Sequence, residues 1–357
     1  MTPLFRPRLT LPAGLAATAL LLLWALVRPD GTAAAGWLVG LVFALGIALG
    51  ALALSATAAL TGGRWEASLW PALGPVTAGL VLFLPLAAPL LFLVPAGLYP
   101  WAAKPELAVH ADVAAGWLNG FGFALRGLVA LAFWAVLGPL ILLLRGSART
   151  LVAALALPLH FVALTVVSTD WVLSTDPRFH STAFGMQVLV MQILAALAWA
   201  AALQPEPAGE APGRSEDLAG LLVAAALGVL YLGFVQYLTI WYGDVPDKAR
   251  WFLARQGWGW GVILGLATIL AAAVPVAAAT LRGVRRSPRR LAFVGMAVLG
   301  GLLLHWCWII LPPFGAFSIL AAVLGTVGVG GLWLGLMQAL IGHRLVGDPT
   351  ERLRHAV

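Results

Sequence analysis

Apolar residues occur in long continuous runs along this chain, and short segments rich in charged or turn-forming residues separate the runs. The runs show no alternation of apolar and polar positions, so they do not predict the strands of a membrane barrel. A transmembrane helix needs roughly 20 consecutive apolar residues. The sequence therefore predicts ten helical spans, at 11–27, 33–60, 73–94, 117–144, 151–167, 183–203, 218–241, 259–281, 291–311 and 317–341.

Composition supports a membrane protein. Of the 357 residues, 62% are hydrophobic and only 10% are charged, which a water-soluble domain could not carry without exposing apolar surface. In hydrocarbon the backbone must satisfy its own hydrogen bonds, and continuous apolar runs do this as helices. We expect a single all-α polytopic domain over residues 1–357, with a polar, proline-rich linker at 204–217.

Positive charge predicts the orientation of this domain. Loops on the side of the N-terminus hold 14 of the 21 Lys and Arg residues, whereas loops on the opposite side hold six. Cytoplasmic loops carry the excess of positive charge, so both termini are expected in the cytoplasm. The basic residues lie in short loops near lipid headgroups, and we therefore expect no nucleic-acid partner.

The cysteine count and the positions of the acidic residues exclude or disfavour several kinds of chemistry. Cys307 is the single cysteine, so the chain cannot form an internal disulfide, a Cys-ligated iron–sulfur cluster or a C-x-x-C-H haem attachment. All acidic residues are predicted in loops or at span edges, which disfavours a pump built on a buried carboxylate relay. No metal site or other cofactor is predicted in this chain.

Arg126 is the one charge predicted within a span, near the bilayer midplane. Such a charge needs a partner, and Asn119 seven residues earlier falls on the same helix face. Asp170 and Asp176, in the neighbouring outer loop, could also pair with it. Arg126 would then either clamp helices together or hold a polar group at a site.

Polar residues gather on the predicted outer side. Two outer loops, 168–182 and 242–258, are rich in aromatic and charged residues, as interfacial helices are. The outer polar cluster could bind the head of a lipid-soluble molecule or meet a partner protein. Its members are Asn119, Asp170, Asp176, His180, Gln236, Asp244 and His305.

Two other interpretations remain open. His160 and His305 lie in spans and could ligate one b-type haem, although hydrogen bonds between helices are the commoner role for such residues. Pro85, Pro89 and Pro275 could break helices around the central site of a transporter or channel.

Four stretches resemble one family of membrane proteins. The segment DWVLSTDPRFHSTAFG at 170–185 is similar to the DW-x-M-S-L-x-P-x-W-F-S-T-x-F-G stretch of ActF, a subunit of bacterial alternative complex III. ActF belongs with the NrfD-like, polysulfide reductase type membrane proteins. Stretches at 117–126, 236–246 and 306–312 resemble the family's Y-L-N…F-F-x-x-R, Q-Y/F-L-x-I-W-Y-x-N-x-P and Y-W-x-x-x-P patterns in the same order.

This resemblance implies a cofactor-free subunit of a quinol-oxidising complex in the bacterial inner membrane. Two four-helix bundles plus two peripheral helices are expected, with haem c and iron–sulfur clusters in partner subunits. The resemblance implies that the chain faces quinone or docks partners and aids proton transfer, as an auxiliary subunit that does not catalyse alone. If it contacts quinol, Asp170, Asp176, His180 and Arg126 are the candidates, with a carboxylate or imidazole accepting a proton. His305 stands near a position that is often acidic in the family, and Asp244 replaces a frequent Asn.

Overall fold

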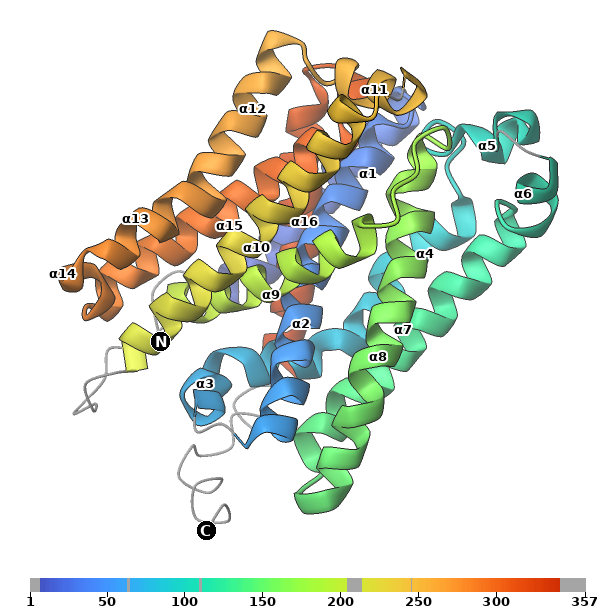
Figure 1. Ribbon diagram of the computed structural model, residues 1–357. Helices are drawn as coiled ribbons and strands as arrows, with labels where there is room; N and C mark the ends of the chain where they lie inside the picture. The colour runs from blue at the N-terminus through green and yellow to red at the C-terminus, as the bar shows by residue number, and fades with distance from the viewer. Residues whose placement is uncertain (1–6, 63–64, 109–110, 204–213, 245, 341–357) are drawn as a thin grey trace.

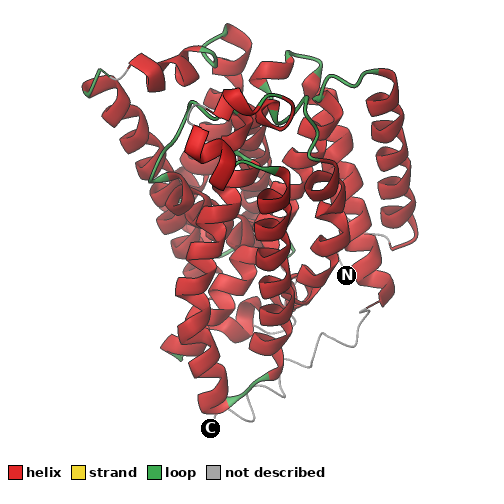
Figure 2. Cartoon of the chain, turned by 90° about the vertical axis from the view of Figure 1, so that its right-hand side faces the viewer, coloured by secondary structure: helices red, strands yellow, loops and turns green. Residues whose placement is uncertain are grey.

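The computed structural model describes residues 7–62, 65–108, 111–203, 214–244 and 246–340, and every regular element in these residues is a helix. The helices run side by side along one common direction (Figures 1 and 2). The elements are α1 (Pro7–Val27), α2 (Thr32–Thr61), α3 (Trp65–Ala78), η1 (Gly79–Leu82), α4 (Phe83–Leu93), α5 (Pro100–Ala103), η2 (Pro105–Ala108), α6 (Ala111–Gly116), α7 (Gly120–Leu143), α8 (Gly146–Trp171), η3 (Leu173–Thr175), α9 (Phe184–Ala202), α10 (Arg214–Tyr242), α11 (Pro246–Leu253), α12 (Trp258–Thr268), η4 (Ile269–Ala273), α13 (Val274–Thr280), α14 (Arg282–Arg285), α15 (Pro288–Ile310), η5 (Pro312–Phe314) and α16 (Ser318–Leu340).

Ten helical stretches in the described residues are long and apolar enough to cross a bilayer, which confirms the predicted all-α membrane fold. Each overlaps one predicted span. They are Leu9–Val27, Thr32–Thr61, Leu69–Leu93, Gly120–Leu143, Gly146–Thr175, Phe184–Ala202, Ser215–Tyr242, Gly259–Thr280, Pro288–Ile310 and Ser318–Leu340.

The helices pack as two groups of four spans. In the first bundle, α2, α7 and α8 pack with the span formed by α3, η1 and α4. In the second bundle, α9, α10 and α15 pack with the span formed by α12, η4 and α13. α2 packs against α9 and joins the bundles, whereas α1 and α16 pack outside them against each other and against α2.

The short helices lie at one end of the molecule. Figure 1 shows α5, α6 and α11 together at its top, and most of the connecting loops gather at the same end in Figure 2. We call this the upper end. The predicted interfacial helix in 242–258 is present there as α11, whereas 168–182 holds only the last turn of α8 and the short η3.

α2 and α16 approach each other through small residues. A Cβ atom at Gly36 would overlap the carbonyl group of Ala321, and a Cβ at Gly325 would overlap that of Gly36. Gly40 lies four residues after Gly36 and also faces Gly325. Such spacing of small residues lets membrane helices pack closely enough for extensive van der Waals contact.

The predicted linker at 204–217 is shorter in the structure. Residues 204–213 lie outside the described part of the chain, and α10 begins at Arg214. Glu216 and Asp217 occupy the first turn of α10, where negative charge interacts favourably with the positive end of the helix dipole. The last four residues of the predicted linker, 214–217, thus belong to α10.

Candidate functional site

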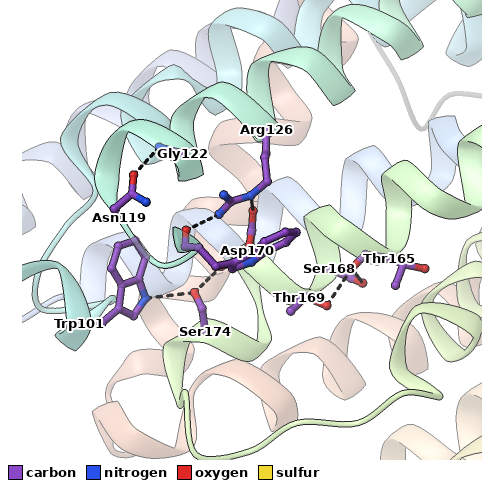
Figure 3. A network of polar contacts seen from close by, with 10 residues as sticks. Trp101, Asn119, Gly122, Arg126, Thr165, Ser168, Thr169, Asp170 and Ser174 are labelled. Atoms are coloured by element: carbon purple, nitrogen blue, oxygen red, sulfur yellow. Dashed lines mark hydrogen bonds and ion pairs between the residues drawn. The ribbon is translucent and has the colours of Figure 1, made fainter. Parts of the chain in front are cut away.

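The upper end of the first bundle carries an ion pair built on the start of α7. Asn119 is the N-cap of this helix, and its Oδ1 accepts a hydrogen bond from the backbone N–H of Gly122 at 2.7 Å. Arg126 follows in the second turn. Its guanidinium reaches across to Asp170 on the last turn of α8, as Figure 3 shows.

Both oxygens of the Asp170 carboxylate have donors. Arg126 Nε lies 2.6 Å from Asp170 Oδ2, and Trp117 Nε1 donates to Asp170 Oδ1 at 2.8 Å. Arg126 Nη2 also donates to the backbone oxygen of Trp117 at 2.9 Å, and the guanidinium lies 4.2 Å from the centre of the Trp117 ring. Asp170 is only 1% exposed. This saturated network clamps α7 and its preceding turn to α8.

The predicted position of Asp170 was wrong, and the structure fixes where Arg126 and Asn119 lie on α7. Asp170 was expected in a loop, yet it lies on α8, because the helix continues four residues beyond its predicted end. Arg126 was expected near the midplane. Since α7 begins only at Gly120, Arg126 lies about 9 Å along the helix from that upper end. Asn119 is a cap rather than a partner on the same helical face.

The end of α8 is tied to the preceding connection by further hydrogen bonds. Tyr99 donates its hydroxyl to the backbone oxygen of Trp171 at 2.9 Å. Trp101 Nε1 donates to Ser174 Oγ at 3.2 Å, and Ser174 in turn donates to the backbone oxygen of Asp170 (Figure 3). These contacts fix the end of α8, which carries Asp170.

A second polar group joins three helices of the second bundle. Gln236 Nε2 of α10 donates to Gln187 Oε1 of α9. Gln187 Nε2 lies 3.3 Å from Nε2 of His305 on α15. In the tautomer with its ring proton on Nδ1, His305 Nε2 accepts a hydrogen bond from this amide nitrogen. We call Gln187, Gln236 and His305 the polar triad.

The polar triad lines a cavity of about 450 Å³ between α9, α10, α12 and α15. This volume falls in the range of small-molecule sites. Most of the lining is apolar or aromatic. Phe234 and Tyr237 line the cavity and are 57% and 47% exposed, so it opens onto the apolar surface of the bundle.

Arg255 and three aromatic residues bound the same cavity toward the upper end. The ring of Phe179 stacks on that of Trp251 with centroids 4.3 Å apart, and the guanidinium of Arg255 lies 3.6 Å from the centre of Trp251. Trp308 meets Trp251 edge to face at 5.4 Å. Burial lowers the pKa of Arg255 to about 9, and the nearby charge of Asp176 acts in the opposite direction. Arg255 therefore remains a cation at neutral pH.

One wall of the cavity contains a π-helical turn. η4 (Ile269–Ala273) follows α12, and Ala271 and Ala272 line the cavity. Pro275 has no N–H to donate to the carbonyl four residues earlier, which favours a local widening of the helix. Such π-turns often occur at functional sites. Pro275 thus follows a π-turn that lies next to the cavity.

The structure divides the predicted outer cluster. Asn119, Arg126 and Asp170 form the ion-pair network, whereas Gln236 and His305 line the cavity. Of the other members, Asp176 is half-buried and its charge acts on Arg255 at the edge of the cavity, whereas His180 and Asp244 are exposed. The sequence pattern did not predict a site role for Arg255 or Gln187. It did single out 242–258, the segment that carries Arg255, by its aromatic and charged residues.

The two histidines considered as haem ligands have different surroundings. His160 of α8 packs edge to face on Trp134 at 5.9 Å and lies beside Gln192. His305 contacts Gln187 and lies 5.9 Å from Trp308. Gln187 and Gln192 are five residues apart on α9 and so point to different sides of that helix. The arrangement does not direct both imidazoles at one haem.

In comparisons with known proteins, neither a family model nor a curated relative matched the chain.

Proposed function

We propose that this chain is a membrane subunit of a quinol-oxidising respiratory complex of the alternative complex III type. The observation that carries the proposal is the cavity of about 450 Å³, which is apolar and aromatic on most sides and polar at Gln187, Gln236 and His305. It opens onto the apolar surface of membrane-spanning helices, from which a lipid-soluble molecule can enter.

A quinone matches the chemistry of this cavity. Its ring is flat and apolar and suits walls formed by Trp251, Phe252 and Trp308. Its oxygens accept hydrogen bonds in the oxidised form and donate them in the reduced form. Amide and imidazole groups can donate or accept, so the polar triad can serve both forms.

Partner subunits would supply the electron carriers. The chain has one cysteine, Cys307, and the four motif-like stretches resemble a cofactor-free subunit, so haem c and iron–sulfur clusters belong to partners in this proposal. The excess of Lys and Arg on the side of the N-terminus supports a bacterial inner-membrane location with cytoplasmic termini. In this proposal the chain contacts quinone and docks its partners, and its upper end faces those partner subunits.

The test is quinone binding to the purified protein in detergent, measured by quenching of tryptophan fluorescence with a decyl-substituted para-benzoquinone. We expect Gln187→Leu to weaken binding about tenfold, because Gln187 makes both hydrogen bonds that hold the polar triad together. Gln192→Leu is the matched control, since Gln192 lies on the same helix and is equally buried, at 4% against 6% exposed. Equal affinities for the two variants would contradict the site.

Purification through an affinity tag tests the assembly. We expect partner subunits with haem c and iron–sulfur absorbance to accompany the chain when membranes of its own host are solubilised gently. Recovery of the chain alone would reject the respiratory-complex assignment even if quinone binds.

A further inference from the structure

The cavity has a second polar region at Arg255. This side chain lines the cavity, is 3% exposed and belongs to the connection after α11. Nη1 donates to the backbone oxygen of Trp251 at 2.9 Å, and Nη2 donates to that of Ile309 at 2.8 Å. Within the described residues, Nε has no hydrogen-bond partner, and no carboxylate lies within ion-pair distance of the guanidinium.

Two helix ends and the nearby charge of Asp176 interact with this buried cation, and they leave part of its hydrogen-bonding capacity unused. Trp251 lies in the last turn of α11 and Ile309 in the last turn of α15, where backbone oxygens carry the negative end of the helix dipole. A guanidinium has five N–H donors, and the backbone engages two of its three nitrogens. A buried donor without an acceptor is unfavourable by about 1–3 kcal/mol, so an acceptor in the cavity would stabilise Arg255.

The polar triad and Arg255 lie at different depths of the same cavity. His305 and Ile309 are four residues apart on α15, which corresponds to about 6 Å along the helix. The ring of Trp308 lies 5.9 Å from that of His305, and the ring centre of Trp251 lies 3.6 Å from the Arg255 guanidinium. These two tryptophan rings meet at 5.4 Å, so aromatic side chains connect the two polar regions of the cavity.

We infer that the cavity selects a para-quinone, with one ring oxygen at the polar triad and the opposite oxygen at Arg255. This inference rests on the proposed function and specifies its ligand and orientation. The oxygens of a para-quinone lie on opposite ring carbons, so each can accept a hydrogen bond at its own end of the ring. One such ligand can therefore engage both the polar triad and the Arg255 guanidinium, which line the same cavity. A ligand with one oxygen can satisfy only one of them.

The experiment compares two ligands and two variants. The ligands are a decyl-substituted para-benzoquinone and a para-decylphenol, which has a single ring oxygen. We expect Arg255→Gln and Gln187→Leu each to weaken quinone binding about tenfold, as loss of one good hydrogen bond does. The phenol should respond to only one of the two variants, because its oxygen reaches one polar region.

Other outcomes separate the two proposals. Quinone binding that responds to Gln187→Leu but not to Arg255→Gln would overturn the two-ended orientation and leave the proposed function standing. A phenol equally sensitive to both variants would also overturn it, since that result indicates general loss of the cavity. Absence of quinone binding to the unaltered protein would reject the proposed function itself.

A measurement on the unaltered protein covers the case in which Arg255→Gln fails to fold. If both oxygens are recognised, the quinone binds at least about tenfold more tightly than the phenol, which corresponds to one additional hydrogen bond. Equal affinities of the unaltered protein for the two ligands would overturn the inference without reference to any variant.

Discussion

Arg126→Leu is expected to destabilise the protein by about 3–5 kcal/mol, because it leaves the Asp170 carboxylate buried without its cation. Asp170 is 1% exposed, and Trp117 Nε1 would be its one remaining side-chain donor among the described residues. The measurement is the shift in denaturant midpoint in detergent, followed by circular dichroism.

The partner variant and the double variant separate the charge effect from lost packing. Asp170→Leu should cost less than Arg126→Leu, since the Arg126 side chain is 19% exposed and keeps its bond to the backbone oxygen of Trp117. The double variant should be more stable than Arg126→Leu alone, because no unpaired charge stays buried. If the stability losses of the two single variants simply added in the double variant, the buried ion pair would not be the source of the effect.

Gly325→Ala is expected to separate α2 from α16, the closest helix contact described above. The added Cβ would overlap backbone atoms of Gly36, which cannot move aside as a flexible side chain can. Overpacking of this kind costs about 1–3 kcal/mol or more. Thermal unfolding and monodispersity in detergent report the loss.

Gly330→Ala supplies the control on the same helix. Nothing lies within 4 Å of a Cβ at Gly330, and alanine favours helix over glycine by about 0.5–1 kcal/mol. We therefore expect Gly330→Ala to leave the unfolding temperature unchanged or raised. If both variants lowered it equally, close backbone approach at Gly325 would not be the cause.

The residues at which helices end depend on local hydrogen bonds, which the pattern of apolar residues does not predict. The polar run after Val167 suggested a loop, yet α8 continues through it to Trp171. Ser168 and Thr169 donate their hydroxyls to the backbone oxygen of Thr165 at 3.1 and 2.8 Å (Figure 3). Hydroxyl side chains that bond to the preceding turn need no water, so the helix can carry them. This continuation buries Asp170 beside Arg126.

The pattern of apolar residues was sufficient to predict the ten helical spans, because backbone hydrogen bonding in lipid permits little else for apolar runs of this length. The sequence also drew attention to Arg126, Asp170, Gln236 and His305, since polar groups near membrane helices need partners. The identity of those partners followed from the packing of the helices. Gln187, Gln236 and His305 belong to helices far apart in sequence, and Arg255 reaches their cavity from a short connection. Contacts between helices depend on how complete surfaces pack, and no single span's pattern contains that information.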